Sequence, residues 1–146
     1  MKNWDLWFQD FMLLDGLTVQ ENICLPQIIA KKPIAQMEAK AEKLCRLFGI
    51  EKIRNKYPAE ISGGEKQRTA VARALMNQPY IILADEPTGN LDSVTSMEVV
   101  GLLKSCAARF HQTTLIVTHQ EEVAQMADRV IRMSDGKIYT RDCNDC

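Results

Sequence analysis

The sequence predicts an α/β fold in which helices flank a mostly parallel β-sheet. Two short apolar runs, residues 80–84 and 113–118, are bounded by turn residues and are typical of buried parallel strands. Segments with helical periodicity come before, between and after these runs. Of the 146 residues, 46% are apolar, which is enough for one packed core of ordinary domain size.

The segments that precede the first strand are predicted to be mainly helical. Residues 17–30 have a mixed pattern, which Pro26 is expected to interrupt. Residues 34–48 place apolar side chains on one helical face, and Gly49 follows as a C-terminal stop. Residues 56–58 are expected to form a loop.

A third helix is predicted to begin at Ser62. Ser62 and Glu65 have the spacing of a capping box ahead of an apolar-periodic run, and Pro79 ends that run. After the strand at 80–84, the pattern alternates again between helix and strand. The remaining expected elements are a helix at 94–109, the strand at 113–118, a short helix at 121–127, and a hairpin of 129–133 and 137–140 around the turn 134–136.

Chemically reactive side chains follow both predicted strands. Asp85 and Glu86 come directly after the first strand, and His119 follows the second. Ligands of parallel α/β sheets bind at the carboxyl ends of strands, where carboxylates suit a hard cation and a water nucleophile. The alternative is an ordinary exposed turn before Pro87.

The start of the helix at Ser62 is a candidate anion site. Gly63 and Gly64 let backbone N–H groups approach an anion closely, and the helix dipole favours negative charge there. The Ser62 hydroxyl adds a donor. A plain helix cap is the alternative for this short motif.

Composition argues against several classes of function. The 18 basic and 19 acidic residues give a net charge of −1, which lacks the footprint of a nucleic-acid binder. No apolar run approaches the ~20 residues that cross a bilayer. Asp5 and Asp10 stand where a secretion signal would be apolar, so free thiols in a reducing cytoplasm are expected. Cys143 and Cys146 have the spacing of half a zinc site, without a second pair.

Four segments resemble, in order and spacing, motifs of the ATP-binding cassette (ABC) ATPases of membrane transporters. Residues 61–75 (ISGGEKQRTAVARAL) resemble the signature motif, and residues 81–92 (IILADEPTGNLD) resemble the Walker B strand, catalytic carboxylate and D-loop. Residues 116–119 (IVTH) resemble the switch histidine, and residues 8–23 (FQDFMLLDGLTVQENI) resemble the Q-loop and the segment facing the permease. The second and fourth segments are most similar to the branch serving lipoprotein-releasing, macrolide-exporting and peptide-antibiotic-resistance permeases.

The resemblance implies a role for each matching residue. Asp85 would hold Mg²⁺ through water, and Gln9 would complete the shell of the metal and the water. Glu86 would be the general base or orient the attacking water, and His119 would contact the γ-phosphate of ATP. The residues that would grip the nucleotide of the opposite subunit are Ser62, Gly63, Gly64 and Glu65, and Asp92 would couple the two sites across the dimer.

The resemblance also implies a fold, cofactors and partners. The chain would have a partial P-loop NTPase fold of the ABC cassette type and would use ATP and Mg²⁺ as an ATP hydrolase. Its partners would be a transmembrane permease and a second ATPase subunit in a head-to-tail pair, on the cytoplasmic, inner face of the membrane. Residues 10–78 would form the Q-loop and helical signature subdomain, 79–140 the part of the catalytic core from Walker B to the switch histidine, and 141–146 a tail.

One motif of the family has no counterpart in this sequence. The phosphate-binding (Walker A) loop, G-x-x-x-x-G-K-[ST], needs glycines five residues apart, and no two of the seven glycines have that spacing. The resemblance begins at about Phe8, so we expect an N-terminally truncated cassette that binds ATP weakly alone. We expect the missing phosphate-loop strand to belong beside both the Asp85 and His119 strands, and its loss to favour self-association through unpaired edges.

Two other readings compete with an ATP hydrolase. The chain could be a non-catalytic interaction module that lends its signature motif to a complete cassette or docks on a permease. It could also be a DNA-repair cassette, but those proteins insert long coiled coils between the two halves. The short separation of Gly64 from Ile81 and the absence of heptads argue against that reading.

Overall fold

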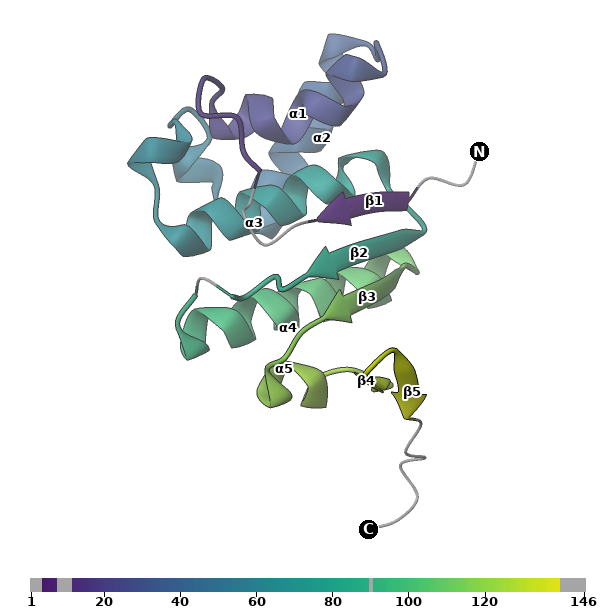
Figure 1. Cartoon of the computed structure of the whole chain (residues 1–146). Helices are drawn as coiled ribbons and strands as arrows, with labels where there is room; N and C mark the ends of the chain where they lie inside the picture. Colours follow the sequence, from purple (N-terminus) through teal and green to yellow (C-terminus); the bar gives the residue numbers. More distant parts are fainter. Residues whose placement is uncertain (1–3, 8–11, 90, 140–146) are drawn as a thin grey trace.

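The computed structural model describes residues 4–7, 12–89 and 91–139. The α/β class is confirmed, with helices and strands alternating along most of the chain (Figure 1). The helices are α1 (Val19–Ile29), α2 (Ile34–Leu47), α3 (Gly63–Ala74), α4 (Ser93–Phe110) and α5 (Glu121–Gln125). The strands are β1 (Trp4–Trp7), β2 (Ile81–Asp85), β3 (Thr113–Val117), β4 (Arg132–Ser134) and β5 (Lys137–Tyr139). Single turns of 3₁₀ helix lie at Glu51–Ile53, Pro58–Glu60 and Leu75–Asn77.

The main sheet has the order β1-β2-β3 within the described residues, and all its strands are parallel. Ile81 on β2 is aligned with Trp4 on β1 and with Thr113 on β3. Strand β1 was not expected, because the sequence analysis found no pattern in the first seven residues. Its four residues nevertheless continue the sheet on the side of β2 away from β3.

The expected position of a phosphate-loop strand beside both the Asp85 and His119 strands is wrong for this sheet. Backbone pairing joins β2 directly to β3, from Ile81 opposite Thr113 to Asp85 opposite Val117. A further strand between β2 and β3 would have to pair with the backbone N–H and C=O groups that already join these two strands. No strand can therefore be inserted between them. Within the described chain, β3, the strand that leads to His119, is an edge strand of the sheet. Its open side is the side that faces away from β2.

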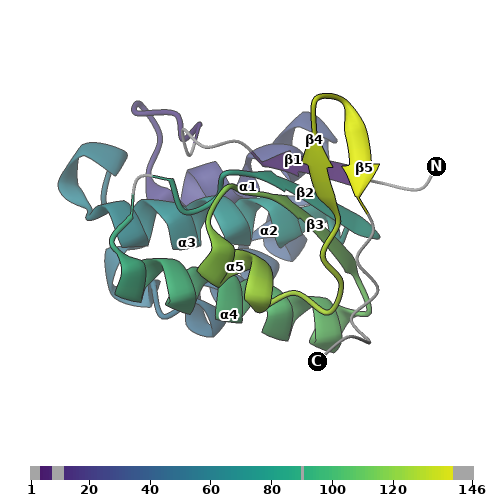
Figure 2. The ribbon, with the colours of Figure 1, turned by 60° about the horizontal axis from the view of Figure 1, so that its bottom comes forward.

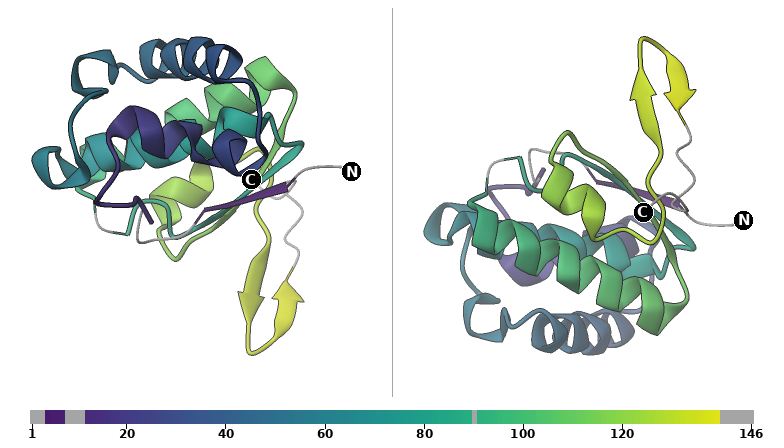
Figure 3. Two further views of the ribbon diagram at one scale, coloured as in Figure 1. Left: turned by 90° about the horizontal axis from the view of Figure 1, so that it is seen from above. Right: turned by 90° about the horizontal axis from the view of Figure 1, so that it is seen from below.

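The helices gather on one face of the sheet, and the β4–β5 hairpin projects from the other side (Figures 2 and 3). Ile82 and Ala84 on β2 point into the core and are buried. On the opposite face, Leu115 and Val117 of β3 are 52% and 58% exposed. The alternation along both strands therefore buries one face and leaves an apolar face open.

Helix α1 continues through Pro26, which the sequence analysis expected to interrupt it. Proline removes the N–H that would bond to the carbonyl of Asn22 four residues earlier. A capping box compensates at the start of the helix, where Thr18 accepts from the Glu21 N–H and the Glu21 carboxylate accepts from the Thr18 N–H. Burial of Val19 and Ile23 adds to this, so the helix persists.

Asn22 fastens the loop before α1. Its side chain is fully buried, and its Oδ1 accepts from the Leu14 N–H at 2.8 Å. Its Nδ2 donates to the carbonyls of Leu14, Leu17 and Thr18 at 3.0–3.1 Å. All the hydrogen-bonding groups of the amide are thus used by the backbone of one loop.

Two other predicted features are confirmed with changed detail. Helix α2 ends before Gly49, which has a φ of +64° and stops the helix as expected. The hairpin is present, but Ser134 pairs with Lys137 inside the ladder. Its turn is therefore only Asp135-Gly136, with φ values of +49° and +73°, as a two-residue hairpin turn requires.

Three cysteines lie in the core between the helices. Burial raises the pKa of Cys45 to about 11, with a smaller contribution from the neighbouring Cys24 thiol, whose own pKa burial also raises. Burial likewise raises the pKa of Cys106 to about 11. All three are free thiols. The tail with Cys143 and Cys146 lies outside the described residues.

Over the ranges that the structure describes, no helix has both the length and the apolar character needed to cross a membrane.

We expect Asn22→Leu to lower the free energy of unfolding by about 2–4 kcal/mol, since four backbone groups lose their buried partner together. Urea denaturation followed by circular dichroism would measure this loss. Gln20→Ala on the same helix is the control and should change stability by less than about 0.5 kcal/mol. Equal stability of Asn22→Leu and the unaltered chain would contradict the role of this amide.

Candidate functional site

The turn after β2 holds Glu86 in an unusual backbone conformation. Glu86 has a φ of +44°, in the left-handed region that side chains other than glycine seldom adopt. Its N–H donates to the Val117 carbonyl of β3 at 2.9 Å, and its carbonyl accepts from the Gly89 N–H at 3.1 Å. The backbone of the neighbouring strand thus keeps Glu86 at the carboxyl end of the sheet.

Glu86 and His119 are in direct contact, as the carboxyl ends of adjacent parallel strands predict. His119 Nδ1 lies 2.7 Å from Glu86 Oε1, and the His119 N–H donates to the same oxygen at 2.9 Å. The Thr118 hydroxyl donates to Glu86 Oε2 at 3.3 Å. Because a carboxylate oxygen only accepts, Nδ1 carries a hydrogen and Nε2 is left toward solvent on a largely exposed ring.

The residues after Glu86 are held from two further sides. Pro87 and Thr88 are both buried. The Pro87 carbonyl accepts a hydrogen bond from Gln67 Nε2 of α3. The Thr88 hydroxyl donates to Gln120 Oε1 at 3.2 Å, next to His119. The turn is therefore tied to α3 on one side and to the segment after β3 on the other.

Asp85 is the last residue of β2, and its side chain is exposed at the same sheet end. Gln9, the other residue expected to take part in magnesium binding, lies outside the described residues. Where side chains are described, no group of three or more His, Cys, Asp or Glu could enclose a metal ion. A magnesium ion held at Asp85 would take further oxygen ligands from water and phosphate, as Mg²⁺ commonly does.

Helix α3 begins with the predicted capping box. The Glu65 carboxylate accepts from the Ser62 N–H at 2.8 Å and from its hydroxyl at 2.9 Å, while Ser62 Oγ accepts from the Glu65 N–H at 3.3 Å. The bond from the Ser62 N–H lowers the pKa of Glu65 below its ordinary value. The Ser62 hydroxyl thus points to Glu65, and the first-turn N–H groups of Gly63 and Gly64 are those without acceptors inside the helix.

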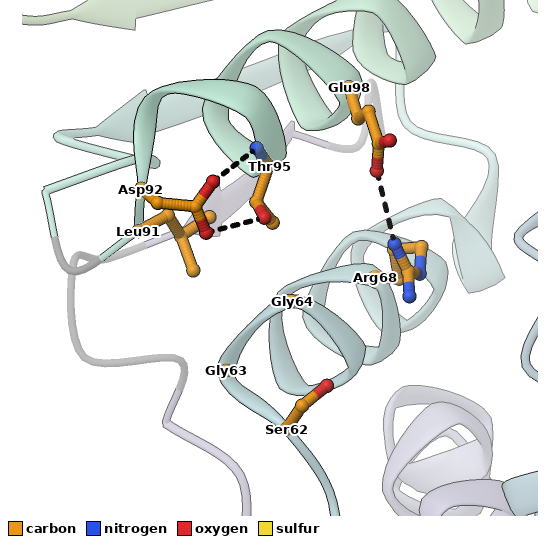
Figure 4. A pocket seen from close by; sticks show the side chains of 8 residues that line it. All are labelled: Ser62, Gly63, Gly64, Arg68, Leu91, Asp92, Thr95 and Glu98. Atoms are coloured by element: carbon orange, nitrogen blue, oxygen red, sulfur yellow. Dashed lines mark hydrogen bonds and ion pairs between the residues drawn. The ribbon is translucent and has the colours of Figure 1, made fainter.

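A cavity of about 390 Å³ lies between the first turns of α3 and α4 (Figure 4). On the α4 side, Asp92 caps the helix by accepting from the Thr95 N–H at 3.0 Å and from its hydroxyl at 2.7 Å. These hydrogen bonds lower the pKa of Asp92. The cavity is lined by Ser62, Gly63, Gly64, Arg68, Leu91, Asp92, Thr95 and Glu98.

Arg68 is a lining residue that the sequence analysis missed. Its Nη1 lies 3.7 Å from Glu98 Oε2 across the cavity, and its Nε is buried without a hydrogen-bond partner among the described residues. Arg68 is the one basic side chain in a lining that also holds the Asp92 and Glu98 carboxylates. The signal was present in the sequence, because Arg68 lies four residues after Gly64 on the same helical face.

The structure sorts the predicted site residues into two groups. Asp85, Glu86 and His119 lie together at the carboxyl ends of β2 and β3. The second group lines the cavity and consists of Ser62, Gly63, Gly64 and Asp92. Glu65, which was also expected to grip the nucleotide, is not among the lining residues and instead accepts from Ser62. The two groups belong to different surfaces that one chain carries, and Gln67 lies between them in α3.

Comparison with known proteins identifies the family. The family model of the ABC transporters matches residues 1–89, which is more than half of the chain. The chain belongs to the ABC transporter family. The match includes the first seven residues, so the expectation that the resemblance begins at about Phe8 is wrong at that end.

The relatives of this ABC chain fall in the predicted branches. The bacitracin export ATP-binding protein BceA of Halalkalibacterium halodurans is 46% identical over 92% of this chain and 53% of its own length. The lipoprotein-releasing system ATP-binding protein LolD of Bacteroides fragilis is 46% identical over 90% of this chain and 61% of its own. The macrolide export ATP-binding/permease protein MacB of an Azoarcus species is 44% identical over 90% of this chain and 20% of its own.

A solved structure supports the fold of this ABC chain. The dimeric ATP-binding cassette MJ0796, in a post-hydrolysis state with ADP and phosphate, superposes with a TM-score of 0.81 and 36% identity. The match covers 95% of this chain and 62% of that one. The P-loop NTPase fold of the cassette is therefore confirmed. The chain spans about half the length of the bacitracin relative.

We expect Gly64→Ala to lower the free energy of unfolding by about 1–3 kcal/mol. A Cβ at Gly64 would lie 2.9 Å from Thr95 Cγ2, and turning Thr95 away would break its bond to Asp92. Gly63→Ala is the matched control, because a Cβ there meets only Leu91 Cδ2 at 3.5 Å. Thermal denaturation of both variants checks this, and equal melting temperatures would contradict the close approach of α3 and α4.

Proposed function

We propose that this chain forms the signature and Walker B portion of an ATP-hydrolysing subunit that powers a membrane permease. The observation that carries the proposal is the contact of the Glu86 carboxylate with His119 at the carboxyl ends of two parallel strands. The ABC family match supports it. So do the relatives whose names describe them as ATP-binding proteins of export or release systems.

The Glu86 carboxylate is suited to orient an attacking water. A carboxylate has about four lone-pair sites, and both sites on Oε1 are used by His119. Oε2 accepts from Thr118 and keeps one site free for a water hydrogen. The fixed geometry places this acceptor at the sheet edge without further rearrangement, which is what general-base catalysis requires. With a second proton on the ring, His119 Nε2 would donate to a phosphate oxygen.

Asp85 and the cavity at the start of α3 would complete two half-sites. Mg²⁺ would neutralise phosphate charge, and the exposed Asp85 carboxylate would hold its water ligands. At the cavity, the first-turn N–H groups of α3 would donate to a phosphate, and the Arg68 guanidinium would add positive charge. Since these donors lie away from Glu86, that phosphate belongs to a nucleotide on a second ATPase subunit.

The proposal includes partners and a location. The second ATPase subunit would pair head-to-tail with this chain, as the dimeric form of the MJ0796 cassette suggests. A transmembrane permease would hold the pair at the inner face of the membrane and would select the transported substrate. ATP and Mg²⁺ are the proposed cofactors, and no nucleic acid takes part.

Replacing the matching residues of BceA by this chain, in an otherwise complete BceA, gives a fused cassette that tests the proposed hydrolysis. We expect the fused cassette to hydrolyse ATP, and Glu86→Gln to lower turnover by ~10²–10⁴-fold because the acceptor for water is lost. Glu122→Gln on α5, an exposed carboxylate, is the control and should leave turnover unchanged.

Two results would overturn the proposed hydrolysis. Unchanged turnover in Glu86→Gln would remove that residue from the reaction. No hydrolysis by a folded fusion, together with stimulation of a complete cassette by the separate chain, would favour the non-catalytic interaction module instead.

We also propose that the chain self-associates through the outer side of β3. The strand Thr113–Val117 has no charged residue to block pairing with another chain. The side chains of Leu115 and Val117, which belong to this strand, are exposed. Light scattering should show a mass that rises with concentration, and Val117→Lys should reduce it. Ile29→Lys, at an exposed apolar position on α1, is the control. A monomer at all concentrations would refute this proposal.

A further inference from the structure

Gln67 is a buried polar residue in the middle of the signature helix. Its side chain has no exposed surface, yet the neighbouring core positions on α3 are apolar, such as Ala70 and Val71. Its Nε2 donates to the carbonyl of Pro87, the residue directly after Glu86. A helix that packs against this turn only for stability would be served by a leucine or methionine of similar volume.

The orientation of the Gln67 amide follows from its partner. A carbonyl oxygen only accepts hydrogen bonds, so the NH₂ group must face Pro87. The amide oxygen then points away, and it is buried without a hydrogen-bond partner among the described residues. Gln67 therefore makes one bond and leaves its acceptor unsatisfied, which is costly for a buried amide. The hydrogen bond to Pro87 is therefore the favourable polar contact that the Gln67 side chain makes among the described residues.

That bond acts on the strained turn. Glu86 has a positive φ, and a conformation of this kind persists only where its surroundings hold it. Val117 holds the turn from β3, and Gln120 holds Thr88 from the segment after β3. Gln67 holds it from α3.

Gln67 and the signature motif lie on one rigid element. Ser62 caps the helix, and Gln67 follows about one and a half turns later. A displacement of the first turn therefore moves Gln67, the Pro87 carbonyl and the adjoining backbone of Glu86 together. His119 would register this movement, because its ring contacts the Glu86 carboxylate.

We propose that Gln67 is a positioning residue that couples the first turn of α3 to the Glu86 carboxylate through Pro87. This inference rests on the proposed function. In that function the first turn of α3 would meet the nucleotide of a second subunit, and Glu86 would be the catalytic base. The link itself is a property of the chain without nucleotide.

Nuclear magnetic resonance of the two histidine rings tests the link in the full chain without nucleotide. The chain contains only His111 and His119, so a His111→Gln variant assigns both signals. We expect Gln67→Met and Gln67→Glu to displace the His119 ring signals and leave those of His111 in place. Methionine keeps the volume but cannot donate, and glutamate turns an acceptor toward the Pro87 carbonyl.

Thr69→Val is the matched control for these variants. Thr69 is equally buried on α3, and its hydroxyl donates to the Glu65 carbonyl within the helix. It should lower stability without displacing the His119 signals. Unchanged His119 signals in a folded Gln67→Met variant, or an equal displacement in Thr69→Val, would overturn the proposal.

A double-mutant cycle tests whether a change at the first turn of α3 reaches His119 through Gln67. Gly64→Ala, in the first turn of α3, presses on Thr95 of α4 and should displace the His119 signals when Gln67 is present. In the Gln67→Met background the same change should have less than half that effect. Equal displacements in both backgrounds would overturn the proposal. Because no ATP is used, this outcome is independent of whether Glu86→Gln affects hydrolysis in the fused cassette.

Discussion

The left-handed conformation of Glu86 is the constraint on which the rest of the site depends. An extended residue there would carry the chain onward from β2, and the carboxylate would not turn back toward β3. Because φ is +44°, the chain bends at once and the side chain meets His119. The strain is offset by bonds that tie the turn to Val117 of β3, to Gln120 after β3 and to Gln67 of α3, so three residues outside the turn share in holding it.

The described part of the chain carries two separate candidate surfaces, and the proposed pairing of two subunits would use both. The sheet edge carries a carboxylate, a histidine and an exposed aspartate, and the α3–α4 cavity carries backbone donors and Arg68. The close approach at Gly64, where a side chain would meet Thr95, keeps the two helix starts near enough to form the cavity. Packing between α3 and α4 thus shapes the proposed docking surface for a second subunit.

The elements that sequence patterns predict well are those whose determinants are local. The capping box at Ser62, the stop at Gly49 and the Glu86–His119 neighbourhood follow from spacing or from the rule that parallel strands end together. Strand β1 could not be found in this way, because four residues are too few for a pattern and its partner lies far along the chain. The bond of Gln67 to Pro87 was missed for the same reason: a helix position shows which face is buried but not which carbonyl it meets.

Alkylation of the buried thiols would report how often the helices in the layer around them separate. Cys24, Cys45 and Cys106 are buried, and burial raises the pKa of each, so these three residues present little thiolate to an alkylating reagent in the folded form. Modification must wait until the surrounding helices separate. Its rate therefore measures how often this layer opens, and a bound partner that steadies the helices would slow the reaction without touching any sulfur atom.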